Sequence, residues 1–170
     1  MRVTYWIARA ALITGVVWSA TSVESIAATP DACALLSRWK VREVVGSPVG
    51  EGESRLISTN FTRCLFHERS GGNTAILVRR FPSGNWEAEQ MSRLRRSVEL
   101  GTYREVAGIG DRAFLGEMRQ GAVLCVFEGE RYLQVSVFRI GGTGGSGPVL
   151  EKLARYALAR LRTERRVEGL

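Results

Sequence analysis

The sequence predicts an α+β fold in which helices cover an antiparallel β-sheet, with the element order α-β-β-α-β-β-β-α. Two observations lead to this prediction. Several short runs alternate apolar and polar residues and are joined by links of hairpin length, which connect antiparallel strands. Other, longer segments have apolar residues at helical spacing, and such helices bury that face against a sheet.

The amino-terminal segment has the three parts of a secretory signal peptide, over residues 1–27. Arg2 and Arg9 supply positive charge, residues 10–18 are uncharged, and small residues follow where signal peptidase cleaves. A retained membrane anchor is the weaker alternative, because a membrane span needs about 20 apolar residues. Cys33 lies well past the apolar run, which disfavours a lipid anchor. We therefore expect a secreted or periplasmic protein without a stable membrane span.

Residues 28–163 are expected to form one α+β domain, followed by a frayed tail over residues 164–170. A domain of about 150 residues can bury some two thirds of its surface and support a core of its own. The formal net charge of the whole chain is +7, and the basic residues are almost all arginine. This charge favours loose attraction to anionic surfaces, although a GC-rich genome would produce the same arginine bias. It names no partner and leaves the oligomeric state open.

The first predicted helix begins at Thr29, a capping residue that precedes a proline and an aspartate. Ser37 restarts this helix, and Gly46 ends it together with the proline two positions later. Residues 46–54 are rich in Gly, Ser and Glu, so we expect a loop there.

Two strands are predicted next, over residues 55–67 and 74–81, with a hairpin-type connection at residues 70–73. A helix then runs from about residue 86 to Leu100 and is terminated by the glycine that follows.

The second half of the chain continues with a glycine turn at residues 108–111 and a short strand at 112–114. Residues 121–128 and 131–140 are predicted to form a hairpin. The last helix is the clearest element, because its apolar residues fall at helical spacing: Leu150, Leu153, Ala154, Ala157, Leu158 and Leu161.

Three cysteines remain after removal of the leader: Cys33, Cys64 and Cys125. In an oxidising compartment we expect one disulfide and one free thiol. We favour the pair Cys33–Cys64, which would link the first helix to an early strand. Cys125 lies in an apolar run and is expected to be buried and unreactive, because apolar surroundings raise the pKa of a thiol.

Residues 142–147 match the pattern Gly-x-Gly-x-x-Gly, which in dinucleotide-binding proteins follows a strand and opens a helix. The chain ends one helix later, so no second parallel strand can complete such a unit. We therefore interpret the run as a flexible connector, with Pro148 setting the start of the helix, and we predict no cofactor.

His67 and Asp111 are the other residues with catalytic potential. His67 follows Cys64 by three residues, so on a strand the two side chains point to opposite faces, which disfavours a catalytic pair. The sequence offers no further ligands for a metal site. Asp111 sits in a glycine turn and is expected to bond its own backbone or to pair with Arg112.

Four arginines on the two long helices are candidates for contact with an anionic partner: Arg93, Arg96, Arg155 and Arg162. Proteins that bind single-stranded nucleic acid interleave such charges with aromatic residues, and these runs lack them, so nucleic acid is not an expected partner. The alternative is an ordinary solvated helix face. Binding of an acidic polymer or lipid requires the two helices to share one face. This hypothesis fails if the four arginines are scattered over different faces of the protein or form ion pairs with glutamates.

Three segments resemble a group of exported bacterial proteins of unknown function, many of them actinobacterial lipoproteins with a PsbP-like fold. These are residues 33–49, the strand cysteine Cys64 followed by Phe66, and residues 106–114. The resemblance implies a PsbP-like sandwich of sheet and helices and a Cys33–Cys64 bridge, and it supplies no catalytic residues. The missing lipid-anchoring cysteine sets this chain apart from many of those proteins.

We therefore expect a non-enzymatic module that binds an envelope protein or an anionic envelope component. The alternatives are a small periplasmic hydrolase, which would need His67, Asp111 and an arginine in one cleft, and an electrostatic binder of acidic polymer or lipid.

Overall fold

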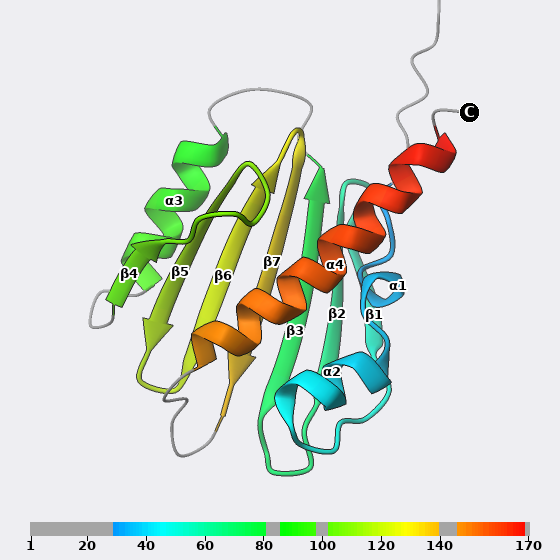
Figure 1. Ribbon diagram of the computed structural model, residues 1–170, viewed down its shortest axis with the longest axis vertical. Coiled ribbons are helices and arrows are strands. Elements are labelled where there is room, and N and C mark those ends of the chain that lie inside the picture. The colour runs from blue at the N-terminus through cyan, green and yellow to red at the C-terminus, as the bar shows by residue number, and fades with distance from the viewer. Residues whose placement is uncertain (1–28, 81–85, 98–101, 140–145, 169–170) are drawn as a thin grey trace, which may run out of the picture.

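The computed structural model describes residues 29–80, 86–97, 102–139 and 146–168, which form one antiparallel sheet with helices on both faces (Figure 1). The strands are β1 (Glu53–Ser58), β2 (Phe61–His67), β3 (Asn73–Arg80), β4 (Thr102–Glu105), β5 (Arg112–Met118), β6 (Gly121–Glu128) and β7 (Arg131–Phe138). The helices are α1 (Ala32–Leu35), α2 (Arg38–Val45), α3 (Trp86–Ser97) and α4 (Ser146–Glu168). The seven strands lie in the order β1-β2-β3-β7-β6-β5-β4.

The two faces of the sheet are covered to different extents. Helix α4 crosses one face diagonally, with α1 and α2 beside it, and we call this the α4 face (Figure 1). Its core is built from buried side chains such as Ile76, Leu124 and Val135 together with the apolar stripe of α4. On the opposite face, the α3 face, Met91 and Leu94 of α3 pack on a smaller cluster over β5, β6 and β7.

The burial of the strands follows from this arrangement. In β2 and β3 every second residue is buried, because only the α4 face of these strands is well covered. All eight residues of β6 are buried, since α4 covers one side of this strand and α3 the other. Edge strand β1 is exposed along its whole length.

The predicted α+β class and the antiparallel sheet are confirmed, but the predicted element order is not the observed one. Residues 55–67 form two strands, with a tight turn at Thr59 and Asn60 between them. In this turn Asn60 Oδ1 accepts a hydrogen bond from Ser58 Oγ at 2.7 Å, and Asn60 Nδ2 donates to the Arg80 carbonyl at 3.2 Å. Neither face of β1 is buried, so the alternation of apolar and polar residues does not mark the end of this strand.

A second difference lies after α3, where residues 102–105 form β4, a strand that was not predicted. Strand β5 also continues to Met118, past the predicted end at residue 114. The predicted restart at Ser37 and the end at Gly46 are confirmed, since these residues cap α2, but α1 is capped by Asp31 and not by Thr29. Helix α4 extends to Glu168, beyond the predicted end at residue 163.

The predicted signal peptide lies outside the described residues, as does most of the glycine-rich run, whose last two members, Ser146 and Gly147, open α4. Pro148 is therefore the third residue of α4 and does not set its start.

Candidate functional site

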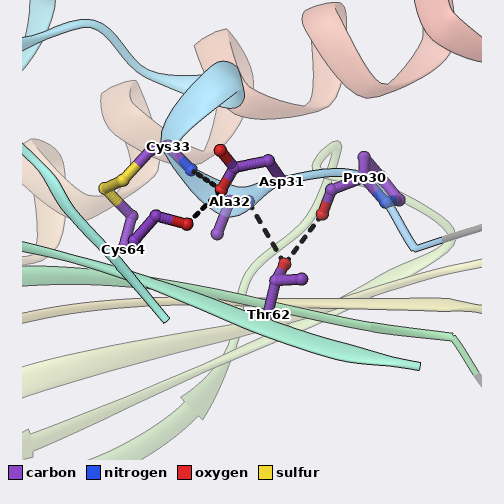
Figure 2. The surroundings of a disulfide bond; sticks show 7 residues. Pro30, Asp31, Ala32, Cys33, Thr62 and Cys64 are labelled. Carbon is purple, nitrogen blue, oxygen red and sulfur yellow. Dashed lines mark hydrogen bonds between the residues drawn. A yellow bond between two sulfur atoms is a disulfide. The ribbon is translucent and has the colours of Figure 1, made fainter. Parts of the chain in front are cut away.

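The predicted disulfide between Cys33 and Cys64 is confirmed, and it links α1 to β2 across a Cα–Cα distance of 4.9 Å (Figure 2). Thr62, two residues earlier on β2, donates a hydrogen bond to the Pro30 carbonyl at 2.7 Å and accepts one from the Ala32 amide at 3.2 Å. Asp31 Oδ1 accepts from the Cys33 amide at 3.0 Å. The bridge and these bonds hold the segment before α2 against the sheet, and this is a structural role.

Cys125 is the remaining cysteine, and the prediction that it is buried is confirmed. Its sulfur lies 3.0 Å from the hydroxyl of Tyr132, which in turn donates to Gln134 Oε1 at 2.8 Å. Burial raises the pKa of the Cys125 thiol to about 11, and the bond to Tyr132 only partly opposes this. The thiolate, which is the nucleophilic form, is therefore scarce at neutral pH.

Raising the pH from 9 to 11 should lower the stability of the wild-type protein more than that of a Cys125→Ala variant. The folded protein holds the thiol proton up to about pH 11, whereas the ordinary pKa of a cysteine thiol is 9.0. This contribution to stability is therefore complete below pH 9 and is lost as the pH rises toward 11. A shift of this size corresponds to about 2.7 kcal/mol. Urea unfolding at several pH values measures it, and parallel pH profiles for the two proteins would contradict it.

The side chains of His67 and Asp111 contact different partners and form no common site. The imidazole of His67 is exposed on β2, where its Nε2 lies 3.4 Å from Glu53 Oε1 at the edge of the sheet. Asp111 accepts a hydrogen bond from the Gly129 amide at 2.7 Å, which ties its glycine turn to the β6–β7 hairpin. Arg112 was one of the two partners predicted for Asp111, the other being its own backbone, but Arg112 pairs with Glu87 of α3 at 2.6 Å.

Within the described residues, no group of three or more His, Cys, Asp or Glu side chains is placed to hold a metal ion. The cleft that the hydrolase alternative requires is likewise not seen among the described residues, because the side chains of His67 and Asp111 contact separate partners, Glu53 and Gly129.

The four helical arginines do not form one surface. Arg93 and Arg96 lie on α3 and Arg155 and Arg162 on α4, so the two pairs stand on opposite faces of the sheet (Figure 1). Each bonds within the protein: Arg93 to Glu89, Arg96 to Ser92, Arg155 to the Gly108 carbonyl, and Arg162 twice to Glu128. The condition for an anionic patch on these helices, a shared face, is not met.

The structure instead brings together three arginines that were not singled out from the sequence, and we call them the sheet arginine cluster: Arg55, Arg63 and Arg79. All three lie on the α3 face, on consecutive strands β1, β2 and β3. Arg55 is directly opposite Arg63 in the strand register. The only sequence signal is their place at alternate positions of strands, and its meaning depends on a register that one sequence does not reveal.

A second unpredicted feature is Trp39 on α2, whose exposed fraction is 62%. The guanidinium of Arg38 lies 4.6 Å from the centre of the indole ring, and that of Arg42 lies 5.7 Å from it. Trp39 also lines two shallow hollows of about 360 and 280 Å³, one bordered by Gly46 and Pro48 and the other by Gly52 and Phe66.

No described helix combines the length and the apolar composition that crossing a membrane requires. No protein-family model matches the chain, and no curated protein is significantly similar to it.

Proposed function

We propose that this chain is an exported, non-enzymatic binding module of the bacterial envelope, secreted or periplasmic, which docks a protein partner through Trp39 and its two flanking arginines. The disulfide supports the proposed compartment, because such bonds form and persist in oxidising environments. The suggested kinship with exported bacterial proteins of PsbP-like fold belongs to the same proposal.

The observation that carries the proposal is the exposed indole of Trp39. Tryptophan and arginine are the residues most enriched at the energetic centres of protein interfaces. Arg38 and Arg42 stack against the ring, which limits the side-chain entropy that would be lost on binding. The hollows on either side give a partner side chain a place to pack against the ring.

The exposed surface continues from α2 toward the edge of the sheet. The second hollow is lined by both Trp39 and Gly52, the residue that precedes β1. Glu51, next to it, pairs with Arg38 at 2.6 Å and so fixes one of the two guanidiniums. A protein partner seated on Trp39 would therefore also touch the start of β1.

The hydrolase alternative is weaker, because catalysis of this kind needs a nucleophile or a carboxylate beside a base in one cleft. The candidates are His67, Asp111 and Cys125. Each contacts a different partner, which is Glu53 for His67, the Gly129 amide for Asp111 and Tyr132 for Cys125.

Replacing Trp39 by alanine should weaken partner binding by about 30-fold, as expected for an interface residue worth about 2 kcal/mol. The full-length protein with its disulfide intact would first capture a partner from envelope extract. The dissociation constant would then be measured with the purified partner by calorimetry.

The matched control is Leu56→Ala on β1, because Leu56 is also a large exposed apolar residue, with an exposed fraction of 67%. This variant should bind like the wild type. Equal binding by the Trp39 variant and the wild type would contradict the proposal, as would equal losses in both variants.

A further inference from the structure

We propose that the sheet arginine cluster binds a phosphate-bearing anion on the α3 face of the sheet. The site is distinct from Trp39, which lies on α2 on the opposite face. The inference therefore does not depend on the proposed docking surface.

The strand register places the three arginines within reach of one ligand. Arg55 and Arg63 are directly opposite each other, and Arg79 is opposite Phe61, two residues before Arg63 on the same face. Residues directly opposite on neighbouring strands have Cβ atoms about 5 Å apart, and diagonal neighbours about 7–8 Å. Two arginine side chains extended toward each other together span either separation, and Arg63 lies on the strand between Arg55 and Arg79, so the three guanidiniums can converge on one small anion.

The arrangement is unfavourable without a ligand. Like charges directly opposite each other destabilise a sheet. Within the described residues Arg55 and Arg63 form no ion pair, and Arg63 Nε is buried without a hydrogen-bond partner. Several arginines elsewhere are paired with glutamates, among them Arg38, Arg104, Arg112, Arg139 and Arg162. A bound anion would neutralise the charge of Arg55 and Arg63, which no ion pair among the described residues compensates.

The surroundings of the cluster strengthen an electrostatic interaction there. The guanidinium of Arg79 lies 5.7 Å from the centre of the Phe61 ring, and half-buried Leu77 lies directly opposite Arg63. Apolar neighbours lower the local dielectric constant, so a charge pair at this place is stronger than one in open solvent. Gln134 is opposite Leu77 on β7, and its Oε1 already accepts from Tyr132, so its amide N–H groups are the donors it can offer a ligand.

The three positive charges of the sheet arginine cluster match a phosphate group better than a carboxylate. A phosphomonoester carries a charge between −1.5 and −2 at pH 7 and has three acceptor oxygens, about one for each guanidinium. A carboxylate offers one charge and two oxygens, which one arginine can satisfy by a two-bond contact. Arginine is also the side chain best suited to bind phosphate through two parallel hydrogen bonds.

The test compares inorganic phosphate with chloride at constant ionic strength, using the full chain with its disulfide intact. Phosphate should raise the melting temperature of the wild-type protein. In an Arg63→Gln variant this rise should disappear, and the affinity for phosphate measured by calorimetry should fall at least tenfold. In the absence of phosphate the same variant should melt at the same or a higher temperature than the wild type, because the repulsion between Arg55 and Arg63 is gone.

The matched control is Arg93→Gln, which removes an exposed, ion-paired arginine from α3. It should keep the full response to phosphate. An equal response in the Arg63→Gln variant, or an equal loss in the Arg93→Gln variant, would overturn the proposal.

Vesicles of phosphatidylcholine with phosphatidic acid identify the source of the phosphate group. Arg63-dependent binding to both vesicles and inorganic phosphate supports a lipid headgroup as the ligand. Arg63-dependent binding to inorganic phosphate alone supports a free phosphate compound. Binding to neither overturns the proposal.

Discussion

Replacing both Cys33 and Cys64 by alanine should lower the free energy of unfolding by close to 4 kcal/mol, which is the largest single effect we expect. The bridge joins residues separated by 31 positions. In the chain-entropy model a closed loop of that size restricts the unfolded chain by about 3.7 kcal/mol. Small domains have total stabilities of only about 5–15 kcal/mol, so the variant should be marginally stable.

Urea unfolding of the double variant measures this loss, and a Cys125→Ala variant with the bridge intact is the control. The folded structure should persist in the double variant, because Thr62 still bonds Pro30 and Ala32. An unfolding midpoint equal to that of the control would contradict a stabilising role for the bridge.

Replacing Glu68 by alanine should cost about 3 kcal/mol, the lower end of the penalty for breaking a buried charge pair, because the Arg139 side chain that is left keeps an exposed fraction of 31%. Glu68 has a side-chain exposure of 0%, and its Oε2 lies 3.3 Å from Arg139 Nε. The same oxygen accepts from Ser47 Oγ at 2.7 Å. Arg139 also donates to the Val45 carbonyl at the end of α2 at 3.0 Å, so the carboxylate links that helix to the ends of β2 and β7.

Glu51→Ala is the matched control, because Glu51 is also a glutamate paired with an arginine, Arg38, at 2.6 Å. The side-chain exposure of Glu51 is 78%, and exposed pairs contribute about 0–1 kcal/mol. Thermal or urea unfolding should therefore separate the two variants clearly. Similar losses in both would show that burial does not control the contribution of Glu68.

The two proposed surfaces lie on opposite faces of the sheet, and this has a functional consequence. Trp39 belongs to α2 on the α4 face, and the sheet arginine cluster belongs to the α3 face. A protein partner on one face would therefore leave the other free for a phosphate group. Binding of the two should be independent unless one of them reshapes the sheet itself.

Several local features of the candidate site could be predicted from sequence. The alternation along β2 placed Cys64 and His67 on opposite faces, and Cys64 is buried and His67 exposed as expected. The apolar run around Cys125 indicated a buried thiol, which the structure confirms. These features depend on residues that are close together in the sequence, and the alternation of side chains along a strand reveals them directly.

The arginines could not be predicted in the same way. Arg93 and Arg162 were singled out because each lies among charged residues on a helix, yet each bonds a glutamate of the protein. Arg55 and Arg63 occur in one stretch, residues 55–67, which the sequence pattern predicts as a single strand, so nothing in that pattern places them opposite each other. The turn at Thr59 and Asn60 folds that stretch back and puts the two arginines opposite each other.

The sequence by itself determined the α+β class and the antiparallel sheet, which follow from periodicity and link length. It favoured the Cys33–Cys64 pair, but the number of cysteines alone does not select it. Only the tertiary structure decided the strand order, the burial of β6 on both sides and the neighbours of Arg63. The physical reason is that strand register is a non-local choice, and a slip of one residue moves every side chain to the other face. The cross-strand contacts that define the cluster therefore exist only once the sheet has formed.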